Sequence, residues 1–236
     1  MTRDSIALNY IKKKRRNKRA AITSLICSLI LTMFIIIAFC VMKVDRFTIT
    51  TQTGSLFLTI DETKQVVTTE LNAPPLLKAS DIQYSDLPTN IEDGLGSKNT
   101  NDYFSYSFYL GSNETTNYSL AMELKESSNE LENAIRVMII RNGVRTIYAK
   151  ANEDGSSKPI YHGETREQHD EILGYTTSFK ENKNIILEPY SISQDSYDRY
   201  TVVMWIDGWE SVNSMKEGIF QIELTFSTLS KIIKEI

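Results

Sequence analysis

The chain has 236 residues, a formal net charge of −4 at pH 7, and 41% hydrophobic and 24% charged residues. After a short head and one apolar segment are set aside, about 190 residues are left, enough for one domain with its own core. No internal repeat or low-complexity tract is present, so one globular domain is the default expectation.

The chain begins with a basic head, residues 1–19. Eight Lys and Arg residues against one Asp give this head a charge of about +7, which leaves about −11 for the rest of the chain. Lys and Arg beside a membrane-spanning helix stay on the cytoplasmic side, so we expect a cytoplasmic amino terminus. A basic run can also bind nucleic acid, but one this short beside a membrane segment does not favour it. We predict no nucleic-acid partner.

Residues 20–42 contain no charged residue. About 20 apolar residues at 1.5 Å each match a hydrocarbon core of roughly 30 Å, so we predict one transmembrane helix, with membrane lipid as its partner. The run is longer than the apolar part of a removable signal, and no pair of small residues marks a cleavage site, so it is predicted to remain as a signal-anchor. Residues 43–236 are then extracellular, in a single-pass cell-membrane protein.

Both cysteines, Cys27 and Cys40, lie in this apolar segment. Their spacing separates them by roughly 140° around a helix, so they cannot bridge within one chain. The predicted extracellular domain therefore has no disulfide. This fits an exported protein of a single-membrane bacterium better than a typical secreted eukaryotic domain.

After residue 43, short runs alternate apolar and polar residues between clusters of Gly, Asn, Asp, Ser and Pro, which is typical of strands with one buried face. Asn142-Gly143 is a strong hairpin signal. With no long helix between the runs, residues 43–236 are predicted to form an antiparallel β-sandwich of jelly-roll or immunoglobulin-like kind. The predicted strands are residues 47–51, 54–60, 65–71, 103–111, 118–124, 135–139, 144–150, 185–187, 199–205 and 219–226.

Two long stretches interrupt this pattern. Residues 71–102 are polar and too long for a simple turn, so we expect them to fold over the domain, with a helical turn near residues 80–87. Residues 151–184 form a second irregular stretch, which holds both histidines.

The carboxy-terminal region carries a resemblance to a known family. Residues 200–210, with the run 218–226 after them, resemble the signature of camelysin/TasA-like surface proteins of Gram-positive bacteria. Residues 103–110 resemble the aromatic strand of that group, and residues 134–148 resemble its central hairpin. The signature residues in this chain are Tyr200, Trp205, Asp207, Gly208, Trp209 and Glu210.

This resemblance implies an exported, jelly-roll-like domain. In the best-known members, that domain assembles into matrix fibres by lending a strand to the next subunit, and camelysin itself is classed as a metalloprotease. This sequence departs from the fibre formers in a leader that is predicted to stay uncleaved and in its long basic head. A subunit tethered to lipid cannot easily free its first strand, so an assembly accessory or a monomeric surface protein is at least as well supported as a fibre subunit.

His162 and His169 are the only histidines. Zinc hydrolysis needs about three protein ligands, two of them often at helical i, i+4 spacing, and a Glu as base. A spacing of seven would put these two rings two turns apart on a helix, too far to share one ion, and Gly163 weakens such a helix. They are weak metal candidates, and we predict no metal and no other cofactor.

Other catalytic arrangements are equally poorly supported. The exported part has no Cys and no Gly-x-Ser-x-Gly elbow. The paired carboxylates Asp207 and Glu210 are interpreted as a solvated acidic face, and residues 152–156 as a turn rather than a calcium loop. Trp205 is expected in the core and Trp209 at the rim of a turn, which argues against a carbohydrate platform.

The sequence therefore predicts a membrane-anchored surface protein whose non-catalytic sandwich serves adhesion or matrix and fibre assembly. Its expected partners are membrane lipid through residues 20–42 and either a second copy or other surface proteins. Two alternatives stay open: a membrane-tethered metallopeptidase of camelysin type, and the ectodomain of a sensor or secretion accessory.

Overall fold

The computed structural model describes residues 22–35, 47–52, 54–73, 81–98, 100, 102–127, 129–161, 172–181, 184–187, 189–211, 215 and 220–229. The chain divides into two compact units, residues 1–44 and 45–236.

In the first unit, residues 22–35 form an α-helix that carries the exposed Cys27. No helix among the described residues combines the length and the apolar character that crossing a bilayer requires. The predicted span of residues 20–42 is thus helical over 22–35, and its remaining residues, with Cys40, lie outside the described ones.

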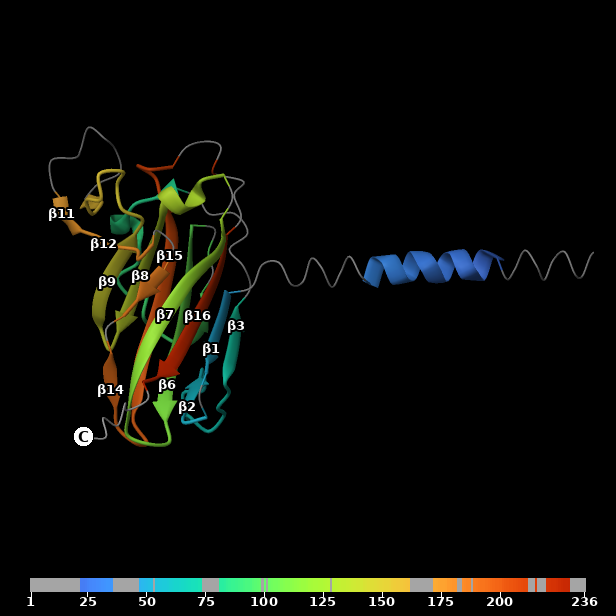
Figure 1. Ribbon diagram of the computed structural model, residues 1–236, viewed down its shortest axis with the longest axis horizontal. Coiled ribbons are helices and arrows are strands. Elements are labelled where there is room, and N and C mark those ends of the chain that lie inside the picture. The colour runs from blue at the N-terminus through green and yellow to red at the C-terminus, as the bar shows by residue number, and fades with distance from the viewer. Residues whose placement is uncertain are drawn as a thin grey trace, which may run out of the picture. The chain divides into compact units, whose positions relative to one another are not determined.

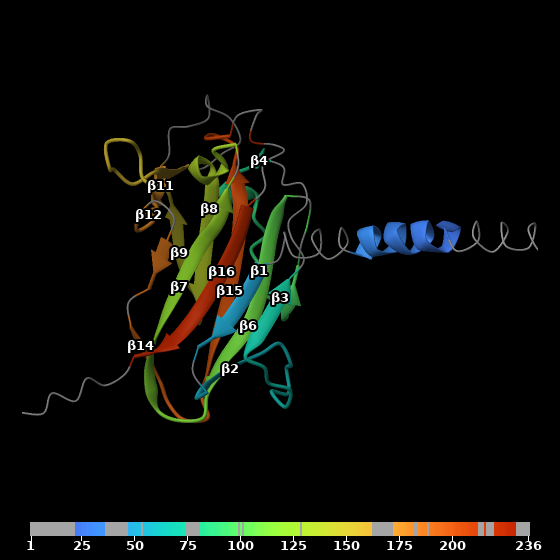
Figure 2. The same ribbon diagram turned by 45° about the vertical axis from the view of Figure 1, so that its right-hand side comes forward.

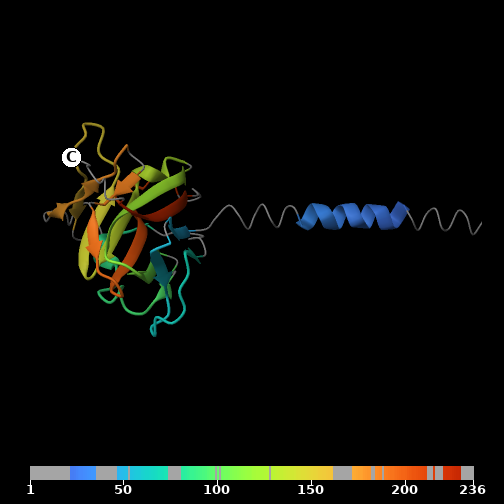
Figure 3. The same cartoon turned by 60° about the horizontal axis from the view of Figure 1, so that its bottom comes forward.

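The second unit is mainly β, and two sheets pack against each other as a sandwich (Figure 1). The first sheet, here called sheet A, has the order β13-β7-β16-β1-β3, and β14 also pairs with β7. Its strands are β1 (Phe47–Thr51), β3 (Glu70–Ala73), β7 (Thr116–Ser127), β13 (Asn184–Ile186), β14 (Tyr190–Ile192) and β16 (Phe220–Thr228). The turn between β6 and β7 lies at the bottom of Figure 1 and comes forward in Figure 3.

The second sheet, sheet B, has the order β12-β9-β8-β15-β6-β2, with β4 beside β15 and β5 beside β6. Its strands are β2 (Leu56–Thr59), β4 (Asp81–Ile82), β5 (Gly96–Ser97), β6 (Tyr103–Ser112), β8 (Ile135–Arg141), β9 (Val144–Ala149), β12 (Thr177–Ser178) and β15 (Tyr197–Asp207). A small separate sheet pairs β10 (Pro159–Tyr161) with β11 (Ile172–Tyr175), and a 3₁₀ turn, η2 (Leu131–Asn133), precedes β8.

The prediction of a wholly antiparallel sandwich is wrong at three pairs. β1 runs parallel to β16, β4 parallel to β15, and β12 parallel to β9. Parallel neighbours cannot be joined by a hairpin and need a long crossover. β1 and β16 are the first and last strands, so nearly the whole domain serves as their crossover. Figure 2 shows β7, β16, β1 and β3 side by side in that order.

The predicted strands and the observed ones agree best where the alternation is longest. Phe104, Tyr106, Phe108 and Leu110 of β6 are buried in the core between the sheets, because a period of two puts them on one face. The run predicted at 65–71 forms a strand only from Glu70, and β2 ends at Thr59, which leaves Ile60 45% exposed.

The predicted hairpin at Asn142-Gly143 is confirmed. Both residues have positive φ, 49° and 81°, and they join β8 to β9. This is the backbone of a type I′ turn, in which Asn and Gly accept the left-handed conformation more readily than other residues.

Residues 81–98 cover part of the outer face of sheet B. They carry the 3₁₀ turn η1 (Tyr84–Asp86), where a helical turn was predicted, and they form a second, smaller core with that face. Ile91 contributes to this core together with Met138, Ile140, Val203 and Trp205. The expectation that this stretch folds over the domain is confirmed for these residues.

Candidate functional site

A buried polar network joins the two sheets between β7, β8 and β15. The carboxylate of Asp198 accepts hydrogen bonds from Arg141 (Nη2–Oδ2 2.8 Å), from Asn142 (Nδ2–Oδ1 2.7 Å) and from the hydroxyl of Tyr118. The hydroxyls of Tyr118 and Tyr200 lie 2.8 Å apart. Since Tyr118 belongs to sheet A and the other members belong to sheet B or its hairpin, the network fastens one sheet to the other.

Burial and hydrogen bonding determine which groups of this network are charged and which are neutral. Burial raises the pKa of Tyr118 and of Tyr200, so both hydroxyls stay protonated. Burial alone would lower the pKa of Arg141, but its hydrogen bonds to Asp198 and Tyr118 outweigh burial and raise it. The network therefore holds one fixed ion pair and two neutral phenols, which is an arrangement suited to structure rather than to proton transfer.

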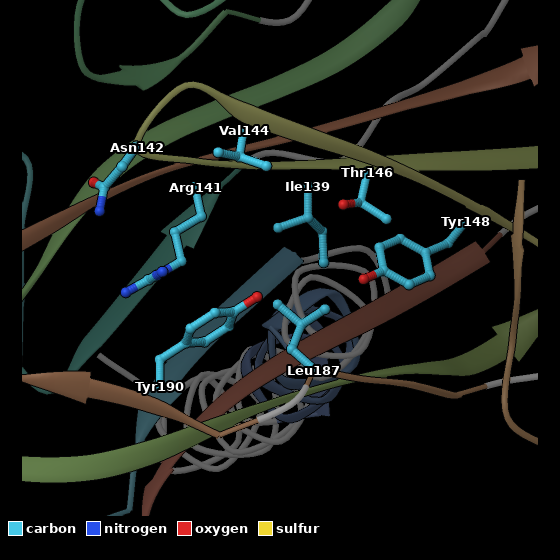
Figure 4. A pocket seen from close by; sticks show the side chains of 8 residues that line it. All are labelled: Ile139, Arg141, Asn142, Val144, Thr146, Tyr148, Leu187 and Tyr190. Carbon is cyan, nitrogen blue, oxygen red and sulfur yellow. The ribbon is translucent and has the colours of Figure 1, made fainter. Parts of the chain in front are cut away.

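Beside this network, a cavity of about 220 Å³ opens between the sheets (Figure 4). Residues of the β8–β9 hairpin line one side, and residues before and within β14 line the other. The lining residues are Ile139, Arg141, Asn142, Val144, Thr146, Tyr148, Leu187 and Tyr190. We call this the flank pocket, because β9 and β14 lie toward the same side of the two sheets.

The flank pocket has an aromatic and apolar wall with a few polar groups. The guanidinium of Arg141 lies 3.8 Å from the ring centroid of Tyr190. Figure 4 shows these two side chains next to each other. Burial, helped by Tyr190, raises the pKa of Tyr148 to about 12, so its hydroxyl is a hydrogen-bond donor at neutral pH. The polar groups among the lining residues are those of Arg141, Asn142, Thr146, Tyr148 and Tyr190, and neither a carboxylate nor a histidine is among them.

The strand beside the flank pocket has an open edge. β9 pairs with β8 along its length, but on its other side β12 pairs only with Tyr148 and Ala149. Residues 144–147 therefore present unpaired backbone groups on that side within the described part of the chain. Val144, at the start of this edge, is 70% exposed. An edge of this kind is a template for pairing with another strand.

The signature residues do not gather at one place. Tyr200 belongs to the polar network, and Trp205 is buried in the second core, where its ring lies 6.4 Å from that of Tyr84. The amide of Gly208 donates to the carbonyl of Ile82 (3.2 Å) and so holds the turn after β15 against β4. The expectation of Trp205 in the core is confirmed.

The interpretation of Asp207 and Glu210 as a solvated face is wrong for Asp207, whereas Glu210 keeps 35% of its side chain exposed. Asp207 is buried and lies 3.3 Å from the buried Arg136 (Oδ2–Nε), and Glu210 lies 2.8 Å from the buried Lys158 (Oε2–Nζ). Two cations from distant parts of the chain therefore neutralise the two acids. Trp209 is half-buried in the same turn, as predicted.

Metal binding gains no support from the described residues. His162 and His169 lie outside them, and within them no group of three or more His, Cys, Asp or Glu could hold an ion. At residues 152–156 the carboxylate of Asp154 accepts hydrogen bonds from the amide and hydroxyl of Ser156, and Gly155 has a φ of +82°. These bonds form the turn that the sequence predicts there.

Comparisons with known proteins do not assign the chain. No family model matches it, and no curated protein matches its sequence. Among solved structures, a β-glucosidase from Kluyveromyces marxianus in complex with glucose gives a TM-score of 0.23 at 9% identity, over 72% of this chain. The matched part spans 15% of that enzyme's length, and a similarity this low carries no argument about fold or function.

Proposed function

We propose that the chain is a bacterial cell-surface protein, anchored through residues 20–42, whose sandwich binds another protein chain in adhesion or matrix assembly without catalysis. The two packed sheets support the finer assignment of a jelly-roll-like domain, which the resemblance to camelysin/TasA-like proteins implies. The flank pocket beside the open edge of β9 is the observation that carries this proposal. An edge offers backbone hydrogen bonds, and an adjacent pocket accepts a side chain, which together are the elements of strand addition.

The position of β1 favours an accessory or monomeric role over a fibre subunit that donates its first strand. β1 lies inside sheet A, paired with β16 on one side and β3 on the other. Its Ile49 is fully buried. The predicted anchor ends at residue 42 and β1 begins at Phe47, so the strand nearest the anchor in sequence is already held by both neighbours. Its release would expose two strand edges and part of the core.

The topology is tested on intact cells of the host. Protease added outside should degrade the region from β1 to β16 and leave a membrane-bound fragment that carries the basic head. Full protection of the sandwich, or recovery of the whole chain in the soluble fraction, would overturn the proposal.

Binding through the β9 edge is tested with Val144→Lys in the full chain. Burying one Val side chain in an interface is worth about 1.5 kcal/mol, so its loss should weaken cell–cell aggregation or cross-linking on the membrane roughly tenfold. Val66→Lys is the matched control, because Val66 is 72% exposed and lies in a loop away from this edge. Equal effects of both variants would contradict the role of the edge. Chelator-sensitive casein cleavage by the purified protein would instead favour the metallopeptidase.

A further inference from the structure

The outer face of sheet B carries an aromatic corner, made by Phe57, Tyr109 and Tyr197. They come from β2, β6 and β15, and all three are half-buried. The rings of Tyr109 and Tyr197 are 6.3 Å apart and meet at 79°. Phe57 packs against Tyr197 at 5.8 Å and 74°. Two tyrosine rings at nearly a right angle, one of them packed against a third ring, thus offer two ring faces to a single bound group.

Gly111 lets this corner form. A Cβ at this position would lie 2.4 Å from the ring of Phe57 and 2.9 Å from the ring of Tyr197. The rings of Phe57 and Tyr197 therefore pack directly on the backbone of Gly111, which brings them together over β6. Any larger residue there would push the rings apart.

The corner already holds a cation. The ammonium of Lys64 lies 4.7 Å from the ring centroid of Tyr109 and 4.4 Å from that of Tyr197. These distances are typical of cation–π attraction. Among the ion pairs of the described residues, none includes Lys64, so the two tyrosines are the groups that attract its charge.

The loop that delivers Lys64 is ordered by its own hydrogen bonds. The carboxylate of Asp61 accepts from the amides of Thr63 (3.0 Å), Gln65 (2.9 Å) and Val66 (3.1 Å). Lys64 itself has a φ of +59°, a conformation that L residues rarely adopt. Because Asp61 holds this backbone without help from the corner, the Lys64 side chain can leave the two rings while the loop keeps its shape, so another cation can displace it.

We propose that the aromatic corner is a binding site for a trimethylammonium group, and that Lys64 is its built-in competitor. A methylated cation is less strongly hydrated than an ammonium and presents methyl groups to both ring faces, which is the basis of quaternary-ammonium recognition by aromatic cages. The chain after residue 42 carries about −11, which attracts cations. This inference does not rest on the proposed function.

The site is tested by titrating choline into the full chain, purified in a maltoside detergent that has no choline group. Lys64→Ala should raise the affinity about tenfold, because the competitor no longer occupies the corner. The double variant Lys64→Ala with Tyr197→Ala should lose this binding, and circular dichroism checks that it folds. Tyr175→Ala is the control, because Tyr175 is 66% exposed in β11 and should leave the affinity unchanged.

A neutral ligand separates charge from shape. 3,3-Dimethylbutanol has the form of choline without its charge and should bind Lys64→Ala far more weakly. Phosphocholine shows which kind of molecule carries the bound trimethylammonium group. If phosphocholine binds as well as choline, the natural ligand is a lipid head group or a choline-bearing polymer. If phosphocholine does not bind, the ligand is a free quaternary amine. Equal binding of choline by the wild type and Lys64→Ala, equal binding of the neutral analogue, or binding that survives the double variant would each overturn the proposal.

Discussion

Two buried charged clusters lie at opposite ends of the ladder between β8 and β15. At one end, Arg141 and Asp198 belong to the polar network that joins the sheets. At the other end, Arg136 faces Asp207, and Lys158 faces Glu210. Both clusters place a buried charged side chain beside a charge of opposite sign, but they differ in how fully the arginine of each is paired.

The difference is visible in the hydrogen bonds. Asp198 receives bonds of 2.8 Å and 2.7 Å from Arg141 and Asn142, together with one from Tyr118. Arg136 lies 3.3 Å from Asp207 and donates to two backbone carbonyls at 3.3 Å and 3.4 Å. Burial raises the pKa of Asp207 although Arg136 opposes it, and burial lowers the pKa of Arg136. Asp207 also accepts a bond of 2.9 Å from the amide of Trp209, and Glu210 lies 2.8 Å from Lys158, so the weak point of the second cluster is Arg136, whose contacts are all 3.3 Å or longer. The first cluster thus offsets the cost of desolvating its arginine with short bonds, and the second does so only partly.

The largest effect is expected from Asp198→Asn. This change removes the negative charge opposite Arg141 and replaces one of the two acceptor oxygens with an NH2 group, which must face a donor, either Asn142 or the Arg141 and Tyr118 groups. The free energy of unfolding should therefore fall by about 3 kcal/mol. Urea unfolding followed by tryptophan fluorescence measures it. Asp195→Asn is the matched control, because Asp195 is exposed and Asn tolerates its φ of +56°. A loss no larger than that of the control would show that the network does not fasten the sheets.

A smaller loss is expected from Arg136→Met at the other end. Met fills part of the space, and Asp207 can take up a proton, so we expect a loss of about 2 kcal/mol at pH 7. The pKa of Asp207 is higher in the folded state than its ordinary 3.8, so the folded domain binds this proton more readily than the unfolded chain does. The stability that Asp207 contributes therefore falls as the pH rises from 3.8 through its folded pKa. The loss should therefore shrink near pH 4. Equal losses at both pH values would contradict this account of Asp207.

Steric crowding on the outer face should cost less than either charged change. Gly111→Ala places a methyl group against Phe57 and Tyr197, whose rings can move outward, so we expect a loss of about 1 kcal/mol. Gly54→Ala is the control, because nothing lies within 4 Å of its added Cβ. Thermal unfolding of both variants measures the difference, and a neutral Gly111→Ala would mean that the rings do not rest on the backbone.

The sequence was sufficient to predict the longer strands and the hairpin, because both follow from local patterns. The short strands β4, β5, β10, β11, β12 and β14 were not predicted. The alternation along β6 determines which of its side chains face the core, and the Asn142-Gly143 pair determines where the chain turns. Each of these signals spans ten residues or fewer. The parallel pairing of β1 with β16 could not be predicted in this way. Ile49 and Leu224 are register partners from opposite ends of the domain, and no local spacing encodes that pairing.

The polar network carried a signal that could have been found. Arg141 continues the inward alternation of Ile135, Val137 and Ile139, and Asp198 precedes the buried Tyr200 by two positions. Opposite charges on inward positions of two strands predict a buried pair. The pairing of Asp207 with Arg136 gave no such signal, because Asp207 lies where β15 passes into a turn and its partner is on the outer face of β8.

The smallest effect at neutral pH is expected from Tyr148→Phe, which removes a hydroxyl from the flank pocket near the network. Burial raises the pKa of Tyr148 to about 12 from an ordinary 10.0, so the folded domain keeps a proton that the unfolded chain releases. The stabilisation that the Tyr148 hydroxyl contributes is therefore fully present below pH 10 and is lost as the pH rises toward 12. Tyr148→Phe should leave the urea midpoint at pH 7 nearly unchanged. Between pH 10 and pH 11 the midpoint of the variant should decline less than that of the wild type. Tyr175→Phe, at an exposed position, should do neither. An identical alkaline decline in wild type and Tyr148→Phe would show that this phenol is not held neutral by the fold.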